Sequence, residues 1–295
     1  MNCNLCPKKC NIDRDLKPGT CGVTNKIKIA RANLHFWEEP CISGENGSGT
    51  VFFSGCPLKC VFCQNYDLSY KNNGKEISVE KLADIFLNLQ NQKANNINLV
   101  TPTHYVPQII DALKIAKQGG LTIPIVYNSS GYENVGTLKM LDGYIDVYLP
   151  DFKYFSNDIA KKYSNVSNYF EFATNAVKEM FRQVGEFSLD ENGIIKHGMI
   201  VRHLILPGFS EDSKDVIAHV YDLFRDKIYI SIMNQYTPLP HVSKYPEINR
   251  KVTDEEYDDV VEFALSLGIE NAFIQEGDTA KESFIPNFDS ESNIF

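Results

Sequence analysis

Short apolar runs alternate with segments of helical periodicity along most of this sequence. The runs predict buried strands, and the repeats of about 3.6 residues between them predict helices. A strand, a helix and another strand in succession form a right-handed crossover between parallel strands. Six or more such units predict an α/β fold, a full or partial (β/α) barrel of parallel strands. The predicted strands are 50–54, 97–100, 123–127, 145–149, 199–206, 228–233 and 272–274, and the predicted helices are 78–92, 105–118, one that 138–141 closes, 169–184, 213–224 and 253–267.

Three segments lie outside this alternation. Residues 27–37 alternate between apolar and polar positions, which predicts one or two strands before the first unit. The glycine-rich stretch 43–49 predicts a turn into the first strand, because it lacks the Lys-Ser/Thr pair of a phosphate-binding loop. Residues 190–193, Asp-Glu-Asn-Gly, predict a hairpin turn.

The chain of 295 residues has the size of one hydrophobic core with a small appendage. We expect three regions along it. Residues 1–45 form a Cys-rich, metal-binding N-terminal extension, residues 46–281 form the barrel core, and residues 282–295 form an acidic C-terminal tail.

Composition narrows the class of protein. Hydrophobic residues make up 43% and charged residues 23%, which is typical of a soluble enzyme. No apolar run approaches the ~20 residues of a membrane span, and residues 1–4 lack the pattern of a signal peptide. The net charge of −9 argues against nucleic acid as a partner. Eight cysteines in short clustered spacings indicate metal ligands rather than disulfides. We therefore expect a reducing, anaerobic cytoplasm, with neither a membrane nor a nucleic-acid partner.

Three cysteines, Cys56, Cys60 and Cys63, follow the first predicted strand at C-x3-C-x2-C spacing. A loop this short can bring three thiolates to one face of an iron–sulfur cluster, and thiolates are the usual ligands of such clusters. It supplies no fourth ligand, so one iron keeps the open position of a catalytic metal site. The alternative is a structural zinc site, which usually needs four ligands, and no fourth lies nearby in the sequence.

With Phe62 before its last cysteine, this motif resembles the signature of radical S-adenosylmethionine (radical SAM) enzymes. The resemblance implies a [4Fe–4S] cluster whose open iron binds the amino and carboxylate groups of SAM. It further implies that an electron from the cluster cleaves SAM to methionine and a 5′-deoxyadenosyl radical, and that Cys56, Cys60 and Cys63 are the catalytic ligands. Such an enzyme also needs a low-potential electron donor of the flavodoxin or ferredoxin type.

A second array, Cys3, Cys6, Cys10 and Cys21, lies in a segment with little apolar content. Such a segment needs a metal to hold its fold. Four thiolates suit either a structural zinc ion or an auxiliary iron–sulfur cluster, with a slight preference for the cluster. The remaining alternative is four free thiols in a mobile segment. Cys41 stands alone and is expected to be a small buried hydrophobic residue, although it could replace one of the four.

Polar residues follow the predicted strands, where a barrel gathers its functional groups. A SAM site needs charges opposite the SAM carboxylate and ammonium groups, and hydrogen bonds for the ribose. Asp151 and Lys153 could instead form a solvated pair, whereas Arg202, between apolar neighbours, requires a partner. His104 is as often a surface residue as a catalytic one, and His203 alternates away from Arg202. The candidate SAM-binding residues are Thr101, Thr103, Asn128, Ser130, Asp151, Lys153, Arg202 and Gln235.

Several stretches resemble the activating enzymes of glycyl-radical enzymes, specifically the PflX-type relatives of pyruvate formate-lyase activating enzyme. These are the N-terminal cysteines, Ser43-Gly44 with 47–50, 53–56, 63–65 and 100–104. The resemblance covers nearly the whole chain. It implies that the Asp-x-Lys pattern after the fourth strand, here Asp151 and Lys153, contacts SAM, as does Arg202 on the fifth. One departure is Thr101-Pro102-Thr103-His104, where those enzymes usually carry Gly-Gly-Glu-Pro. This departure and the extra N-terminal cysteines leave the identity of the hydrogen donor open.

Three functions remain in competition. The first is a radical SAM oxidoreductase that activates a glycyl-radical enzyme or acts on another protein substrate. The second is radical SAM modification of another peptide or metabolite. The third is a non-catalytic iron–sulfur electron carrier, which the polar strand ends disfavour.

Overall fold

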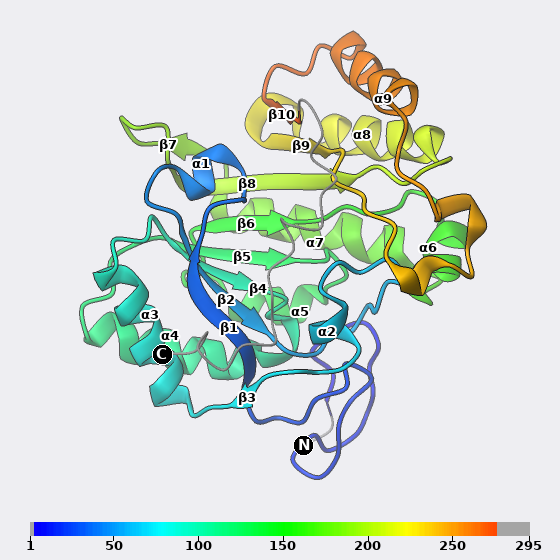
Figure 1. Ribbon diagram of the computed structural model, residues 1–295. Coiled ribbons are helices and arrows are strands. Elements are labelled where there is room, and N and C mark those ends of the chain that lie inside the picture. Colours follow the sequence, from blue (N-terminus) through cyan, green and yellow to red (C-terminus); the bar gives the residue numbers. More distant parts are fainter. Residues whose placement is uncertain (1–2, 276–295) are drawn as a thin grey trace.

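The computed structural model describes residues 3–275, so the predicted acidic tail at 282–295 lies outside the described residues (Figure 1). The strands form one ten-stranded sheet in the order β10-β9-β8-β6-β5-β4-β2-β1-β3, with β7 beside β8. The strands from β2 to β10 along this order are parallel to one another, and β1 and β3 continue the sheet antiparallel. In the described residues the two edges, β10 and β3, do not pair. The α/β prediction is confirmed, and the barrel is partial.

The central parallel strands are short and buried on both faces. All residues of β4, β5 and β6 are buried, as expected where helices cover one face and a packed interior fills the other. The strands are β1 (Lys28–His35), β2 (Ser48–Phe53), β3 (Lys75–Glu76), β4 (Ile97–Val100), β5 (Ile125–Ser129), β6 (Val147–Pro150), β7 (Ser188–Leu189), β8 (Ile195–Leu204), β9 (Tyr229–Met233) and β10 (Ala272–Ile274).

The helices pack in neighbouring pairs, α3 with α4 and α8 with α9, at the two ends of the sheet (Figure 1). Their starts follow local chemistry. Ser78 caps α3 by accepting from the amide of Lys81, and Thr253 and Glu256 form a capping box at α9. The helices are α1 (Pro40–Ser43), α2 (Tyr66–Ser69), α3 (Val79–Asn91), α4 (Val106–Gln118), α5 (Val135–Met140), α6 (Asn157–Ser164), α7 (Tyr169–Val184), α8 (Ser210–Phe224) and α9 (Asp254–Ser266).

The N-terminal segment before β1 docks at the carboxyl ends of the parallel strands. Arg14 is 3% exposed and donates to the backbone carbonyls of His104, Val23 and Thr24. The Nε2 atom of His104 in turn lies 2.8 Å from the carbonyl of Ser54 at the end of β2. A buried guanidinium bonded to three carbonyls therefore joins the extension to the core. His104 is a buried structural residue.

Several local elements differ from the sequence-based expectation. Residues 157–164 form α6, which was not expected because the segment is short and largely polar. Residue 43 ends α1, so the expected turn into β2 begins one residue later. The hairpin turn at 190–193 is confirmed, because Asp190 and Ile194 are hydrogen bonded and β7 pairs antiparallel with β8. None of the helices in residues 3–275 is long and apolar enough to span a bilayer.

Candidate active site

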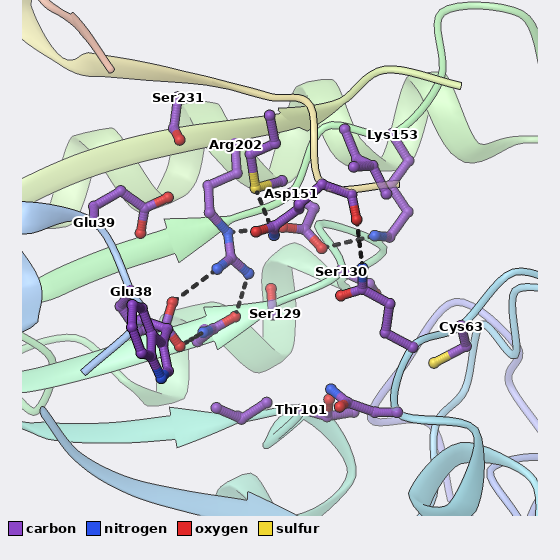
Figure 2. A pocket seen from close by; sticks show the side chains of 18 of the residues that line it. Glu38, Glu39, Cys63, Thr101, Ser129, Ser130, Asp151, Lys153, Arg202 and Ser231 are labelled. Atoms are coloured by element: carbon purple, nitrogen blue, oxygen red, sulfur yellow. Dashed lines mark hydrogen bonds and ion pairs between the residues drawn. The ribbon is translucent and has the colours of Figure 1, made fainter. Parts of the chain in front are cut away.

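A cavity of about 500 Å³ lies inside the curved sheet, within the usual range for small-molecule sites. It extends from the loop after β2 to the segment after β1, and residues of both β2 and β10 line it. The predicted residues that line it are Cys56, Cys60, Cys63, Thr101, Asn128, Ser130, Asp151, Lys153, Arg202 and Gln235 (Figure 2).

The loop that carries Cys56, Cys60 and Cys63 is held in place by its backbone. Gly55 has φ +88°, and a Cβ atom there would lie 2.9 Å from the carbonyl oxygen of Cys21. Only glycine fits this close approach in the left-handed region. Further along the loop, the Tyr70 hydroxyl donates to the carbonyl of Lys59 at 2.6 Å. The loop is therefore shaped before any ligand binds.

The three thiols lie together in a buried environment. Burial and the neighbouring thiols of Cys63 and Cys60 raise the pKa of Cys56 to about 12, and burial with Cys60 raises the pKa of Cys63 to about 11. Burial also raises the pKa of Cys60, although Lys153 opposes it. Three crowded buried thiols stay protonated unless positive charge arrives among them. This is what an iron–sulfur cluster supplies, since its ligands are thiolates.

The chemistry and placement of the three thiols fit an iron–sulfur cluster. They come from one short loop and line one cavity. Thiolates are the usual ligands of such clusters, and three of them leave one iron of a [4Fe–4S] cluster without a protein ligand. The residues present therefore fit a cluster with three protein ligands.

A chain of ion pairs crosses the cavity beside these thiols. Lys153 Nζ lies 2.7 Å from Asp151 Oδ2, Arg202 Nε lies 2.9 Å from Asp151 Oδ1, and Arg202 Nη1 lies 3.0 Å from Glu38 Oε2 (Figure 2). Arg202 Nη2 also donates to Asn128 Oδ1 at 2.7 Å. Asp151 and Lys153 are thus not a solvated pair, and Arg202 has the partners that its burial requires.

The same contacts show that Arg202 and Lys153 differ in how many of their N–H groups already bond to the protein. Three of the five N–H groups of Arg202 already bond to Asp151, Glu38 and Asn128. Arg202 therefore holds the protein network together, whereas Lys153, which also lines the cavity, pairs with Asp151 alone among the described residues. Burial would raise the pKa of Asp151, but Arg202 and Lys153 outweigh it and hold that pKa below its usual range. Asp151 is a carboxylate at neutral pH.

The polarity of the site complements SAM. The three acidic side chains Glu38, Glu39 and Asp151 stand against the two basic side chains Arg202 and Lys153, which leaves one negative charge in excess when all are ionised. SAM carries a sulfonium, an ammonium and a carboxylate, hence one net positive charge. Opposite charge in a largely buried cavity favours binding more than it would in water.

Comparison with known proteins identifies the family. The model of the radical SAM superfamily matches residues 50–220, more than half of the chain. The chain belongs to the radical SAM superfamily. It is 30% identical over 272 residues to an uncharacterized protein of Methanocaldococcus jannaschii, covering 89% of this chain and 74% of that one. It is 23% identical over 216 residues to the pyruvate formate-lyase-activating enzyme of Clostridium pasteurianum, covering 70% and 82%.

The fold has solved counterparts as well. The crystal structure of HydG, a maturase of the [FeFe]-hydrogenase, superposes with a TM-score of 0.51 at 14% identity. The superposition covers 78% of this chain and 52% of that one, so this chain spans about half the length of that protein. The radical SAM superfamily uses a [4Fe–4S] cluster and SAM, and its members are enzymes of radical chemistry.

Within this radical SAM core, not every predicted residue lines the cavity. Thr103 is buried and donates from Oγ1 to Glu133 Oε1 at 2.6 Å, so its hydroxyl faces the interior. His203 is also buried, with Nδ1 2.7 Å from the carbonyl of Phe152, and it points away from the cavity as its alternation with Arg202 indicated. Gln235 lines the cavity, and its carbonyl accepts from Gln64 of the cluster loop at 2.8 Å.

The N-terminal cysteines gather next to the cluster loop. A Cβ atom on Gly19 would lie 3.3 Å from Cys21 Sγ and 3.7 Å from Cys10 Sγ. Burial raises the pKa of Cys6 to about 12, with contributions from Cys21 and Cys10. The amide of Cys56 donates to the carbonyl of Cys21 at 3.1 Å, which joins the two cysteine groups directly. Cys41 lies elsewhere, in a buried apolar cluster of Ile42 and strand residues, as expected for a small hydrophobic residue.

Sequence reasoning missed two acidic residues of the cavity, Glu38 and Glu39. They follow β1, which runs antiparallel to β2, so they reach the end of the cavity opposite the carboxyl ends of the parallel strands. The one available signal was the position of this acidic pair directly after the aromatic residues 36–37. Carboxylates that are buried beside such residues need partners, which is typical of a binding site.

Proposed function

We propose that this enzyme binds a [4Fe–4S] cluster through Cys56, Cys60 and Cys63 and cleaves SAM reductively to abstract a hydrogen atom from a substrate in the same cavity. The observation that carries the proposal is the shared cavity of the three thiols and the Lys153–Asp151–Arg202 network. When bound, the cluster and SAM supply the electron and the 5′-deoxyadenosyl radical, and the protein supplies binding, orientation and electrostatics.

The side chains around the cavity have defined tasks in this proposal. Lys153 provides the positive charge for the SAM carboxylate, and Asp151 holds the Lys153 ammonium at 2.7 Å. Ser130 and Gln235 offer a hydroxyl and an amide for the ribose and adenine. The apolar walls exclude water, which protects a reactive carbon radical from side reactions.

The sharpest form of the proposal is an activase of a glycyl-radical enzyme. The likeness to the Clostridium pasteurianum activating enzyme supports it, together with the resemblance of Asp151, Lys153 and Arg202 to the activase pattern. Exposed aromatic side chains beside the cavity also offer a contact surface for a protein substrate. Trp37 lines the cavity and is 64% exposed, and the adjacent Phe36 is 50% exposed. The electron donor would be a flavodoxin or ferredoxin in a reducing, anaerobic cytoplasm.

A second candidate is radical modification of another peptide or a metabolite. The Thr101-Pro102-Thr103-His104 stretch favours it, because it replaces the usual activase sequence after β4. Thr101 takes φ +59°, a left-handed conformation that costs energy in a non-glycine residue and marks a functional position. Both candidates share the same initial chemistry.

Anaerobic incubation of the reconstituted protein with SAM and dithionite is expected to yield 5′-deoxyadenosine, measured by liquid chromatography. An electron carrier forms none, so its absence contradicts the proposal. Addition of pyruvate formate-lyase tests the activase form, which predicts a glycyl-radical signal on the added protein by electron paramagnetic resonance. Formation of 5′-deoxyadenosine without that signal favours another peptide or metabolite as substrate.

We further propose that Cys3, Cys6, Cys10 and Cys21 share a second metal site, with an iron–sulfur cluster slightly preferred over zinc. Their gathering beside the cluster loop supports the proposal, since a redox centre there would lie close to the first. A zinc ion would instead staple a segment that has little apolar core of its own.

Metal analysis of the anaerobically reconstituted protein distinguishes these forms. About eight irons per chain are expected for two clusters, and about four irons with one zinc for the alternative. The variant with all four N-terminal cysteines changed to Ala is expected to keep about four irons and no zinc, because its first cluster is untouched. Wild-type protein with only four irons and no zinc contradicts a second site.

A further inference from the structure

The end of the cavity farthest from the cysteine loop carries a carboxylate that lacks a partner. Glu39 is 8% exposed and lines the cavity, yet its Oε2 atom has no hydrogen-bond partner among the described residues. The hydroxyl of Ser231 on β9 is its neighbour on one side, and Figure 2 shows the carboxylate directed toward Ser231 and Arg202. A buried carboxylate oxygen without a partner is costly, so something that donates to it is expected in the working enzyme.

The nearby guanidinium of Arg202 does not supply the missing partner of Glu39. The guanidinium of Arg202 pairs with Glu38 at 3.0 Å and with Asp151 at 2.9 Å, and no ion pair to Glu39 occurs in the described residues. Glu38 is also satisfied by the amides of Asn98 and Asn128, at 3.1 and 3.3 Å. Burial raises the pKa of Glu39, and the adjacent Glu38 raises it further, against the lowering effects of Arg202 and Ser231. Among the described residues, an ionised Glu39 is therefore a carboxylate of this cavity that no ion pair balances.

The order of the contacts places this carboxylate on the substrate side. From the cysteine loop inward, the chain of ion pairs runs through Lys153, Asp151, Arg202 and Glu38. The SAM carboxylate is assigned above to Lys153, at the loop end. Glu39 lies at the same end of the cavity as Glu38, on the other side of the Arg202 guanidinium (Figure 2), where a substrate would extend away from SAM.

The walls around Glu39 suit an apolar stem that bears the cation. Phe273 of β10 pairs in register with Ser231, the neighbour of Glu39, and Trp37 lies two residues before Glu39; both line the cavity. Alkyl chains that end in an ammonium or guanidinium bury their stem against such surfaces and pair the charged head. Aromatic faces add to the attraction for a cation.

We propose that the substrate presents an organic cation, an alkylammonium or guanidinium group, to Glu39 at the inner end of the cavity. This inference rests on the proposed function, because it takes the reacting carbon of the substrate to lie between SAM and this end. The cation could belong to a basic side chain of a protein substrate or to a small molecule. Glu39 is then a substrate-binding residue that sets specificity.

The test is calorimetric titration of probes into the SAM-saturated holoenzyme without reductant, so that SAM stays intact. The probes are Nα-acetyl-lysinamide and agmatine, with Nα-acetyl-norleucinamide as the uncharged equivalent of the lysine probe. We expect a cationic probe to bind about tenfold or more tightly than the norleucine probe, as a charge-assisted pair requires. Glu39→Gln is expected to lose this preference. Glu45→Gln, which removes the same charge at an exposed position, is expected to keep it.

A preference for the lysine probe alone indicates an alkylammonium group carried on a peptide unit, and one for agmatine alone indicates a guanidinium or a cation without a peptide unit; both support the inference. Equal binding of charged and uncharged probes, no binding of either cation, or a preference that survives in Glu39→Gln overturns it. A loss of SAM affinity in Glu39→Gln without any probe preference assigns the carboxylate to SAM and also overturns it. Formation of 5′-deoxyadenosine by the same wild-type preparation is measured in parallel. Its absence contradicts the proposed function, whereas the titration alone decides the cation site.

Discussion

Simultaneous replacement of Cys56, Cys60 and Cys63 by Ala is expected to abolish reductive cleavage of SAM. The three thiols line one cavity, and Cys60 raises the pKa values of both Cys56 and Cys63, so they are expected to act as a unit. Without thiolates the loop has no ligand for iron. We expect 5′-deoxyadenosine to fall to the background of a protein-free sample under strict anaerobiosis, with loss of the visible absorbance of the cluster.

The matched control is Cys41→Ala, which removes a buried thiol from an apolar cluster that does not line the cavity. It is expected to keep both cluster absorbance and turnover. If the triple variant still forms 5′-deoxyadenosine, the cluster is held elsewhere and the assignment of these three ligands is wrong. Loss of activity in Cys41→Ala with an intact fold would also argue against the assignment.

The sequence was sufficient for the order of the long helices and the parallel strands, but not for short elements such as α6. The central strands β4, β5 and β6 are short apolar runs that are fully buried, and a helix such as α3 shows both its periodicity and its cap. Because the carboxyl ends of parallel strands meet at one edge, residues as distant as Thr101 and Gln235 were expected to share a site, and both line the cavity. These features depend on local pattern and on a general rule of topology.

The sequence did not predict which residues the irregular segments bring into the cavity. Glu38 and Glu39 follow β1, whose antiparallel pairing with β2 carries them into the interior, and no local pattern specifies that direction. Thr103 shows the converse, since the short 3₁₀ turn Thr103–Tyr105 rotates its hydroxyl toward Glu133 and out of the cavity. Closure of the barrel was left open for the same reason, because edge pairing is a long-range property.

Substitutions of Arg202 and Lys153 are expected to have different effects. The first should lower stability, and the second should lower the affinity for SAM. Arg202→Ala leaves the buried carboxylate of Glu38 without its cation, whereas Asp151 keeps its pair with Lys153, so we expect it to lower the free energy of unfolding by about 3–5 kcal/mol. Lys153→Met leaves Asp151 paired with Arg202, so the fold should persist. It removes a charge-assisted contact, and SAM affinity should fall roughly 10- to 150-fold.

The pH dependence of stability distinguishes the two roles further. In the wild type the pKa of Asp151 is held low, so its contribution is present above the unfolded value of about 3.9 and is lost as pH falls through the folded pKa. In Arg202→Ala, Glu38 loses the guanidinium that opposes the effect of its burial, so its folded pKa, which burial already raises, rises further above the unfolded value of about 4.3. Stability is then lost as pH rises from that unfolded value through the folded pKa. The deficit relative to the wild type should therefore be larger at about pH 8 than at about pH 5.

Urea unfolding of both variants at the two pH values, and calorimetric titration of SAM into reconstituted Lys153→Met, measure these effects. Lys161→Met, which removes an exposed lysine from α6, is the control and should match the wild type in both. Wild-type SAM affinity in Lys153→Met would mean that this lysine serves the unknown substrate. An Arg202→Ala protein as stable as the wild type at both pH values would mean that water or a rearranged partner satisfies the carboxylate of Glu38, and that Arg202 does not hold the network together. If both expectations hold, Asp151 is positioned by Arg202 on one side and presents Lys153 to SAM on the other.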